Sequence, residues 1–214
     1  MSAADEPDAD DDEAADPIDA DLAARLGALW EAYRSDDAAT AVQLGRELVR
    51  QHPSNGEAWF WLGCSLEREG AYQAADRCFV RAAKAAQDAQ GMPFRVGWRQ
   101  FQQAVTVAGD ALPAPLRAAL EEVTLVLADY AEAALLEGFD EPELLGLFVG
   151  NERGDRDEPG TPQISARIHL FRRAHEHACS SRREFTEEIR QTLWHELGHY
   201  LGYDEGELEE LGRG

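Results

Sequence analysis

Basic residues are scarce in this sequence of 214 residues, where 20 lysines and arginines stand against 42 aspartates and glutamates for a formal net charge of −22. Binding to nucleic acid or to an anionic membrane surface needs a surplus of basic side chains. No segment approaches the roughly 20 consecutive apolar residues of a membrane-spanning helix. The chain begins with an acidic segment, whereas a secretory signal is basic and then apolar. We therefore expect a soluble, cytoplasmic protein that binds neither nucleic acid nor membranes.

Cysteine is also scarce, with Cys64, Cys78 and Cys179 as the complete set. An odd number of cysteines without a CxxC pair is not typical of a disulfide framework or of a cysteine-rich zinc site. The 44% of apolar residues is enough to build hydrophobic cores, and the length suits one or two domains. We therefore expect globular domains without disulfides.

The composition divides the chain into three regions. Residues 1–21 hold ten acidic residues and no basic residue, so this segment buries too little apolar surface to offset the entropy lost on ordering. We expect a disordered acidic tail, which either keeps the protein in solution or contacts a partner. Residues 22–109 and 110–214 are predicted to form two folded regions, because prolines and a glycine interrupt the pattern at 109–116.

A helical repeat pattern runs through residues 57–86. Apolar and small residues recur there at the spacing of a helical hairpin, and residues 22–55 carry a weaker copy. The residues of the pattern are Trp59, Leu62, Gly63, Leu66, Gly70, Tyr72, Ala75, Phe79 and Ala82. The pattern resembles a tetratricopeptide repeat, which implies antiparallel helices that bind a protein or peptide partner.

The periodicity changes in the C-terminal region. Residues 123–130 are rich in β-branched side chains and residues 164–171 alternate between two faces, so each predicts a strand. Residues 140–150 are interpreted as a short helix or turn that leads into a further strand. Residues 180–202 predict a helix whose first turn carries a Ser-x-x-Glu capping box. This mixture indicates an α+β domain.

The predicted helix contains the sequence HELGH. His195 and His199 are four residues apart and share one helix face, so both imidazoles can reach one metal ion. Glu196 lies beside them, where its carboxylate can take a proton from a zinc-bound water whose pKa the metal has lowered. Gly202 can end the helix with a left-handed residue, which would bring Glu205 back towards the same ion. The motif therefore predicts a Zn²⁺ site with a general base.

Residues from about 111 to 214 resemble the minimal zincin-like metallopeptidase family of bacteria. Three local patterns carry the resemblance: LLGLFVGNERG at 144–154, RIHLFRRAHE at 167–176, and REFTEEIRQTLWHELGHYLGYDEGEL at 183–208. The resemblance implies a compact domain in which a mixed sheet flanks the zinc helix. The methionine turn of the larger metzincins is absent, because both methionines precede the motif.

The resemblance also implies roles for individual residues. His195 and His199 correspond to zinc ligands, and Glu196 corresponds to the catalytic base. The family position of the third, acidic ligand falls on Glu205. Asp204, one residue earlier, is the alternative, because family members often carry aspartate as this ligand.

Further residues are weaker candidates for contact with a substrate. Arg172 and Arg173 follow the strand predicted at 164–171 and could bind a carboxylate or an oxyanion, or else pair with acidic side chains. Tyr203 lies within the turn after the zinc motif and could contact a reaction intermediate. The same strand could pair with an extended peptide if it lay at a sheet edge. The cluster of histidines at 169–177 is interpreted as solvated surface.

We therefore expect tetratricopeptide-like helical hairpins followed by a compact zincin-like α+β domain. The expected function is zinc-dependent hydrolysis of a peptide or protein substrate through a Glu-activated, zinc-bound water. Zinc-dependent hydrolysis of another amide is not distinguished from it. The alternative is a non-catalytic interaction protein in which the repeats bind a partner and the zinc site is structural or inactive.

Overall fold

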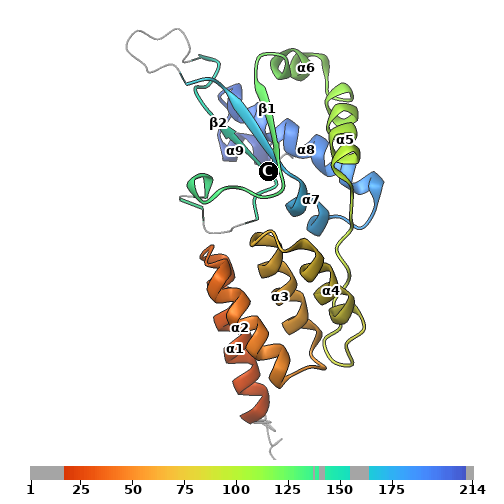
Figure 1. Ribbon diagram of the computed structural model, residues 1–214. Coiled ribbons are helices and arrows are strands. Elements are labelled where there is room, and N and C mark those ends of the chain that lie inside the picture. The colour runs from red at the N-terminus through yellow and green to blue at the C-terminus, as the bar shows by residue number, and fades with distance from the viewer. Residues whose placement is uncertain (1–16, 137, 140–142, 155–163, 211–214) are drawn as a thin grey trace, which may run out of the picture. The chain divides into compact units, whose positions relative to one another are not determined.

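The computed structural model describes residues 17–136, 138–139, 143–154 and 164–210 (Figure 1). Contacts divide the chain into two compact units, one of Met1–Tyr33 and Asp37–Ala89 and the other of Arg34–Asp36 and Gln90–Gly214. Residues 1–16 of the tail expected at 1–21 lie outside the described residues. Residues 17–21 belong to a helix, which corrects the expectation of disorder for them. Among the described residues, no helix is both long enough and apolar enough to span a membrane.

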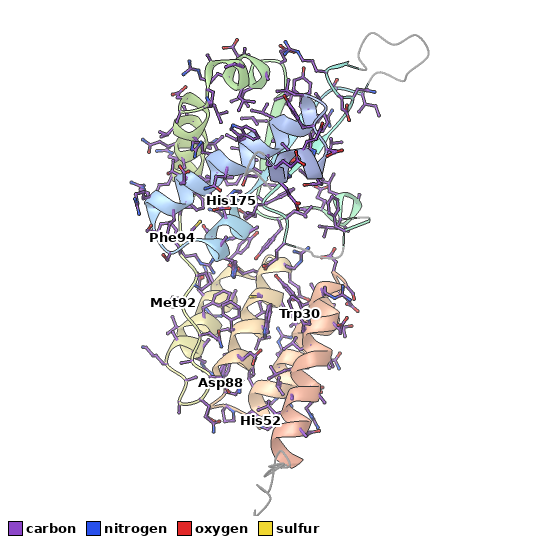
Figure 2. The ribbon with its side chains drawn as sticks, turned by 180° about the vertical axis from the view of Figure 1, so that it is seen from behind. Trp30, His52, Asp88, Met92, Phe94 and His175 are labelled. Atoms are coloured by element: carbon purple, nitrogen blue, oxygen red, sulfur yellow. The ribbon has the colours of Figure 1, made fainter. Side chains whose placement is uncertain are left out.

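Four helices make up the N-terminal unit, as the sequence pattern predicts. They are α1 (Pro17–Arg34), α2 (Ala38–Gln51), α3 (Gly56–Arg68) and α4 (Tyr72–Ala83). Side-chain caps fix two of their starts, because the carboxylate of Asp37 accepts from the Thr40 N–H and the amide oxygen of Asn55 accepts from the Ala58 N–H. Asn55 also donates to Asp88, which lies with His52 at one end of this unit (Figure 2).

Helices α3 and α4 approach each other closely at a glycine. A Cβ atom on Gly63 would lie 2.7 Å from a ring carbon of Phe79, whose side chain is fully buried. Gly45 plays the same part between α2 and α3, where a Cβ atom would lie 3.1 Å from Leu62. The small residues of the repeat pattern therefore set the distance between neighbouring helices.

We expect Gly63→Ala to lower the free energy of unfolding by about 1–3 kcal/mol, because the added methyl group would overlap the fully buried ring of Phe79. Gly27→Ala is the matched control, since a Cβ atom there meets nothing within 4 Å. It should raise the stability by up to about 1 kcal/mol through helix propensity alone. Urea unfolding followed by circular dichroism measures both changes. Equal effects of the two substitutions would contradict the close packing of α3 on α4.

The C-terminal unit is built on a three-stranded mixed sheet in the order β1-β3-β2. The strands are β1 (Thr124–Ala128), β2 (Gly146–Val149) and β3 (Arg167–Phe171). Strand β3 is central, parallel to β1 and antiparallel to β2. The strand predicted at 164–171 therefore has no free edge for a peptide, because β1 and β2 pair with both of its edges, and its buried residues belong to the core. Strand β2 is at the edge on the side of the sheet away from β1.

Several helices accompany this sheet. They are α5 (Trp98–Asp110), α6 (Ala114–Leu120), the short 3₁₀ helix η1 (Ala133–Leu135), α7 (Arg172–Ala178), α8 (Arg182–Tyr200) and α9 (Glu205–Glu210). Helices α8 and α9 lie behind the sheet in the view of Figure 1. The expected mixture of helices and a small mixed sheet is confirmed for this unit. The helix predicted at 180–202 is α8.

One face of α8 forms the centre of the core. Ile189, Leu193 and Leu197 recur at helical spacing, are fully buried, and belong to the same cluster as Ile168 and Leu170 of the central strand. Helix α5 joins this cluster through Phe101, whose ring lies 6.1 Å from that of Phe185. The units consequently divide at residues 89 and 90 and not at the expected 109 and 110, because α5 packs on α8.

Candidate metal centre

Three side chains that can bind a metal meet at the end of α8. The Nε2 atoms of His195 and His199 are 3.0 Å apart. The Oε1 atom of Glu205, the first residue of α9, lies 3.2 Å from His199 Nε2 and 3.7 Å from His195 Nε2. Among the described residues, these three form the one group of histidine, cysteine and acidic side chains that is compact enough to hold an ion.

Two glycines bring α9 back to α8. Gly202 ends α8 with a φ of +92°, a left-handed conformation that side chains other than glycine rarely adopt, and its N–H donates to the His199 carbonyl. Gly198 leaves room for the buried Leu208, since a Cβ atom there would lie 2.5 Å from a methyl group of that leucine. Glu205 is placed beside the histidines because the chain reverses and α9 packs on α8.

The donor atoms fit a tetrahedral zinc ion. Zinc binds histidine nitrogen and carboxylate oxygen at about 2.0–2.1 Å, so tetrahedral angles separate neighbouring donors by about 3.3 Å. The three observed separations of 3.0, 3.2 and 3.7 Å bracket that value. The His199 Nδ1 atom lies 3.1 Å from the carbonyl oxygen of Tyr203, which can only accept, so Nδ1 carries the proton and Nε2 offers its lone pair to the cluster.

Asp204, the alternative ligand, has a different local role. Its Oδ1 atom accepts a hydrogen bond from the Glu207 N–H at 2.9 Å, and its own N–H donates to the Glu207 carboxylate at 3.0 Å. This reciprocal pair is a capping arrangement at the start of α9. The structure therefore brings Glu205 to the histidines and uses Asp204 as a cap. Tyr203 is 43% exposed, and its carbonyl oxygen contacts the His199 ring.

The side chain of Glu196, on α8, contacts the edge strand β2. This side chain is buried, and its Oε2 atom accepts a hydrogen bond from the Phe148 N–H of β2 at 2.7 Å. Gly146 permits this approach, because a Cβ atom there would lie 3.1 Å from Glu196 Oε1 and 2.5 Å from the methyl group of Thr192. Burial raises the pKa of Glu196 above the ordinary value of a carboxyl group. A raised pKa suits a group that accepts a proton near neutral pH.

A cavity of about 300 Å³ opens beside these residues. It lies between α8 and the segment that leads into β2. The residues that line it are Glu143, Leu144, Leu145, Gly146, Glu188, Gln191, Thr192, His195 and Glu196. One wall carries His195 and Glu196 of the zinc motif, and the other comes from the segment at 143–146. The sequence did not predict that these two walls meet, because they are more than 40 residues apart along the chain.

The two arginines proposed as substrate contacts lie in a network of ion pairs. Arg172 donates to the Asp129 carboxylate at 2.7 Å, and Arg173 donates to the buried Glu176 at 2.7 Å. Glu176 also accepts from Arg95 and from the Val96 N–H, so the network ties the segment before α5 to α7. Neither Arg172 nor Arg173 lines the cavity beside Glu196.

His175 is fully buried, which corrects the expectation of solvated surface for this part of the histidine cluster. It lies on α7 (Figure 2), where its Nδ1 atom donates to the Phe171 carbonyl at 2.8 Å. Its Nε2 atom is 3.2 Å from the hydroxyl of Thr192, a residue of the cavity wall. Burial lowers the pKa of His175 to about 4, so the ring is neutral at physiological pH.

The lowered pKa makes the stability dependent on pH. The unfolded chain binds a proton at this ring near pH 6.5, before the folded protein does, so the contribution of neutral His175 is complete above pH 6.5 and is lost as the pH falls towards 4. We expect His175→Gln to reduce the pH slope of the unfolding free energy in this window by about 1 kcal/mol per pH unit. Urea unfolding between pH 7 and pH 4 compares the two proteins. Parallel slopes would contradict a buried neutral ring.

Comparison with known families agrees with this geometry. Residues 120–214 match the family model described as Zincin-like metallopeptidase. The matched segment contains all three strands and helices α7, α8 and α9, and with them His195, Glu196, His199 and Glu205. No curated protein matches the chain. The match does not reach the N-terminal helices, so the tetratricopeptide-like interpretation of these helices stays a prediction.

Proposed function

We propose that the C-terminal unit is a zinc-dependent metallopeptidase. His195, His199 and Glu205 would hold Zn²⁺, and Glu196 would act as the general base. The observation that carries the proposal is the convergence of three donors at tetrahedral spacing next to a buried carboxylate, within a segment that matches a metallopeptidase family. A structural zinc site needs no such carboxylate beside it.

In this mechanism, the residues around the metal site have separate roles. Bound Zn²⁺ supplies Lewis acidity, which lowers the pKa of water and polarises the carbonyl of the peptide. Glu196 takes a proton from the attacking water at Oε1, while the Phe148 N–H holds Oε2 and so fixes the orientation of the carboxylate. The same carboxyl group then gives the proton to the nitrogen of the leaving amine. The Tyr203 carbonyl keeps the His199 ring in the orientation that a ligand requires.

The edge strand offers a place for an extended substrate. The Phe171 N–H donates to the Leu145 carbonyl, so the odd-numbered residues of this segment face β3. The backbone groups of Gly146 and Phe148 therefore point away from β3, on a side where no strand of the described residues pairs with them. A peptide that pairs with this edge would run beside Glu196, which already binds the Phe148 N–H. This arrangement supports a peptide as the substrate class.

The alternative is an interaction protein with an inactive metal site, and the N-terminal helices give it support. Trp30 is 37% exposed, and its ring lies 4.7 Å from that of Trp61. Trp61 is half-buried, so Trp30 alone of the two is exposed. Aromatic residues are enriched in protein interfaces. We propose that these helices bind a protein or peptide partner whether or not the metal site is active. The presence or absence of peptidase activity in the C-terminal unit then decides between a peptidase and an interaction protein.

The test is cleavage of a mixture of synthetic peptides by the purified, zinc-loaded protein, with products identified by mass spectrometry. We expect new peptide termini, their loss after treatment with 1,10-phenanthroline, and their return when Zn²⁺ is added back. Protein that contains zinc and yields no new termini would support the inactive alternative. Cleavage that survives removal of the metal would contradict a zinc mechanism.

A further inference from the structure

The cavity beside Glu196 has an acidic and apolar lining that points to one class of side chain. Leu144, Leu145 and the methyl group of Thr192 supply apolar surface, while Glu143 and Glu188 supply carboxylates. Among the described residues, no lysine or arginine lines the cavity. A ligand that satisfies both parts of this lining combines an aliphatic stem with a positive charge at its end.

The Glu188 carboxylate is the most specific element of the lining. It is half-buried, and it forms no hydrogen bond or ion pair with any residue in the described part of the chain. By contrast, the neighbouring Glu187 pairs with Arg190, and Glu184 accepts from Ser180. A carboxylate that is partly removed from water gains when a cation enters the cavity, because the cation restores part of the lost solvation.

The spacing along α8 fits the length of a basic side chain. Glu188, Thr192 and His195 are separated by four and three residues and share one face of the helix. Seven residues of helix rise by about 10 Å. The extended side chain of a lysine or arginine beside the reacting bond, together with that of Glu188, covers this distance. The apolar stem would then lie along Leu144 and Leu145, which pack on the buried Phe171 and Ala174.

We propose that this cavity receives a lysine or arginine side chain of the substrate, at a residue next to the bond that is cleaved. This inference rests on the proposed peptidase function, because His195 and Glu196 line the same cavity. The charge of the whole chain also favours a basic substrate, since a net charge of −22 attracts cationic peptides. An aliphatic substrate would fill the apolar part and leave Glu188 partly desolvated without a partner.

The experiment compares two peptides that differ at one residue, lysine in one and the uncharged norleucine in the other. Each is tested for cleavage by the zinc-loaded protein and, independently, for binding by fluorescence anisotropy. We expect the lysine peptide to exceed the norleucine peptide at least tenfold in kcat/KM and in affinity. Glu188→Gln should bring both ratios close to one. Glu209→Gln removes the same charge from an exposed position on α9 and should keep both ratios.

The two readouts separate this inference from the proposed function. Cleavage of both peptides at equal rates would overturn the inference and leave the peptidase intact. Tighter binding of the lysine peptide that depends on Glu188, without cleavage, would support the cavity assignment and contradict the peptidase. If the lysine-to-norleucine ratios fall equally in the Glu188 and Glu209 variants, the preference comes from the charge of the whole chain and not from the cavity. That result would overturn the inference. Protein that neither binds nor cleaves either peptide would overturn both.

Discussion

Glu196→Gln is expected to lower kcat by about 10²–10⁴-fold on any peptide that the wild type cleaves, with zinc still bound. Glutamine has nearly the same shape, and its amide oxygen can still accept the hydrogen bond that the Phe148 N–H donates to Glu196 in the wild type. It cannot take a proton from water. The loss should therefore appear in kcat, while the zinc content stays at the wild-type level. Steady-state kinetics and metal analysis on the same preparation measure both quantities.

Glu187→Gln serves as the control for this substitution. Glu187 lies on the same helix, pairs with Arg190 and does not line the cavity, so its loss should leave kcat within about twofold of the wild type. Wild-type turnover by the Glu196 variant with a full complement of zinc would remove Glu196 from the chemistry. Loss of zinc from that variant would instead show that the carboxylate helps to hold the ion.

Glu205→Ala and Asp204→Ala are expected to differ sharply in their effect on zinc affinity. Removal of Glu205 takes away one of three donors and should weaken binding by more than about 100-fold, the upper end of what the loss of an outer-shell partner costs. Removal of Asp204 takes away the cap of α9, which costs about 1 kcal/mol of helix stability. This change should weaken zinc binding by no more than about tenfold. Competition with a chromophoric chelator measures both affinities.

The order of the two affinities decides which acid is the ligand. A larger loss in the Asp204 variant would mean that the turn rearranges when the ion binds and that Asp204 takes the place of Glu205. Equal small losses in both variants would mean that neither carboxylate binds the ion. The double substitution provides a further check, since it should resemble Glu205→Ala if Asp204 acts only as a cap.

The elements that the sequence predicted correctly are those set by local spacing. Helix α8 is visible in the sequence because its apolar residues recur at helical intervals, and Ser181 caps its first turn by accepting from the Glu184 N–H. The approach of His195 to His199 follows from helical geometry alone, since residues four apart share a face. The strand at β3 was found because its residues alternate. None of these features depends on a distant part of the chain.

The features that sequence analysis missed depend on contacts between distant residues. The alternation of residues 164–171 predicts a strand but not its place in the sheet, and β3 is central because β1 and β2 both pair with it. His175 has a polar neighbourhood in sequence, yet it is buried because α8 packs over α7. The position of Phe148 beside Glu196 is likewise set by the fold, because the two partners of the hydrogen bond are 48 positions apart in the sequence.

Asp204 and Glu205, where the turn after α8 leads into α9, are a further case in which the sequence alone did not assign the roles. The resemblance left Asp204 as the alternative to Glu205, because family members often carry aspartate as the third ligand. The start of α9 separates them, since a helix needs a cap at the residue before its first turn and Asp204 supplies it. Glu205 then falls on the first turn, on the side of the histidines. Its role as a ligand stays a prediction until zinc is measured.

The zinc content of the purified wild type, measured beside that of the double variant His195→Ala/His199→Ala, is the decisive test of the metal centre. Both are to be loaded with zinc and then freed of loosely bound metal, and circular dichroism shows whether the variant keeps the helical fold. We expect about one zinc ion per wild-type chain and none in the folded variant, because the variant lacks both histidine ligands. No zinc in the wild type, or equal zinc in both proteins, would contradict the metal centre and the peptidase function built on it.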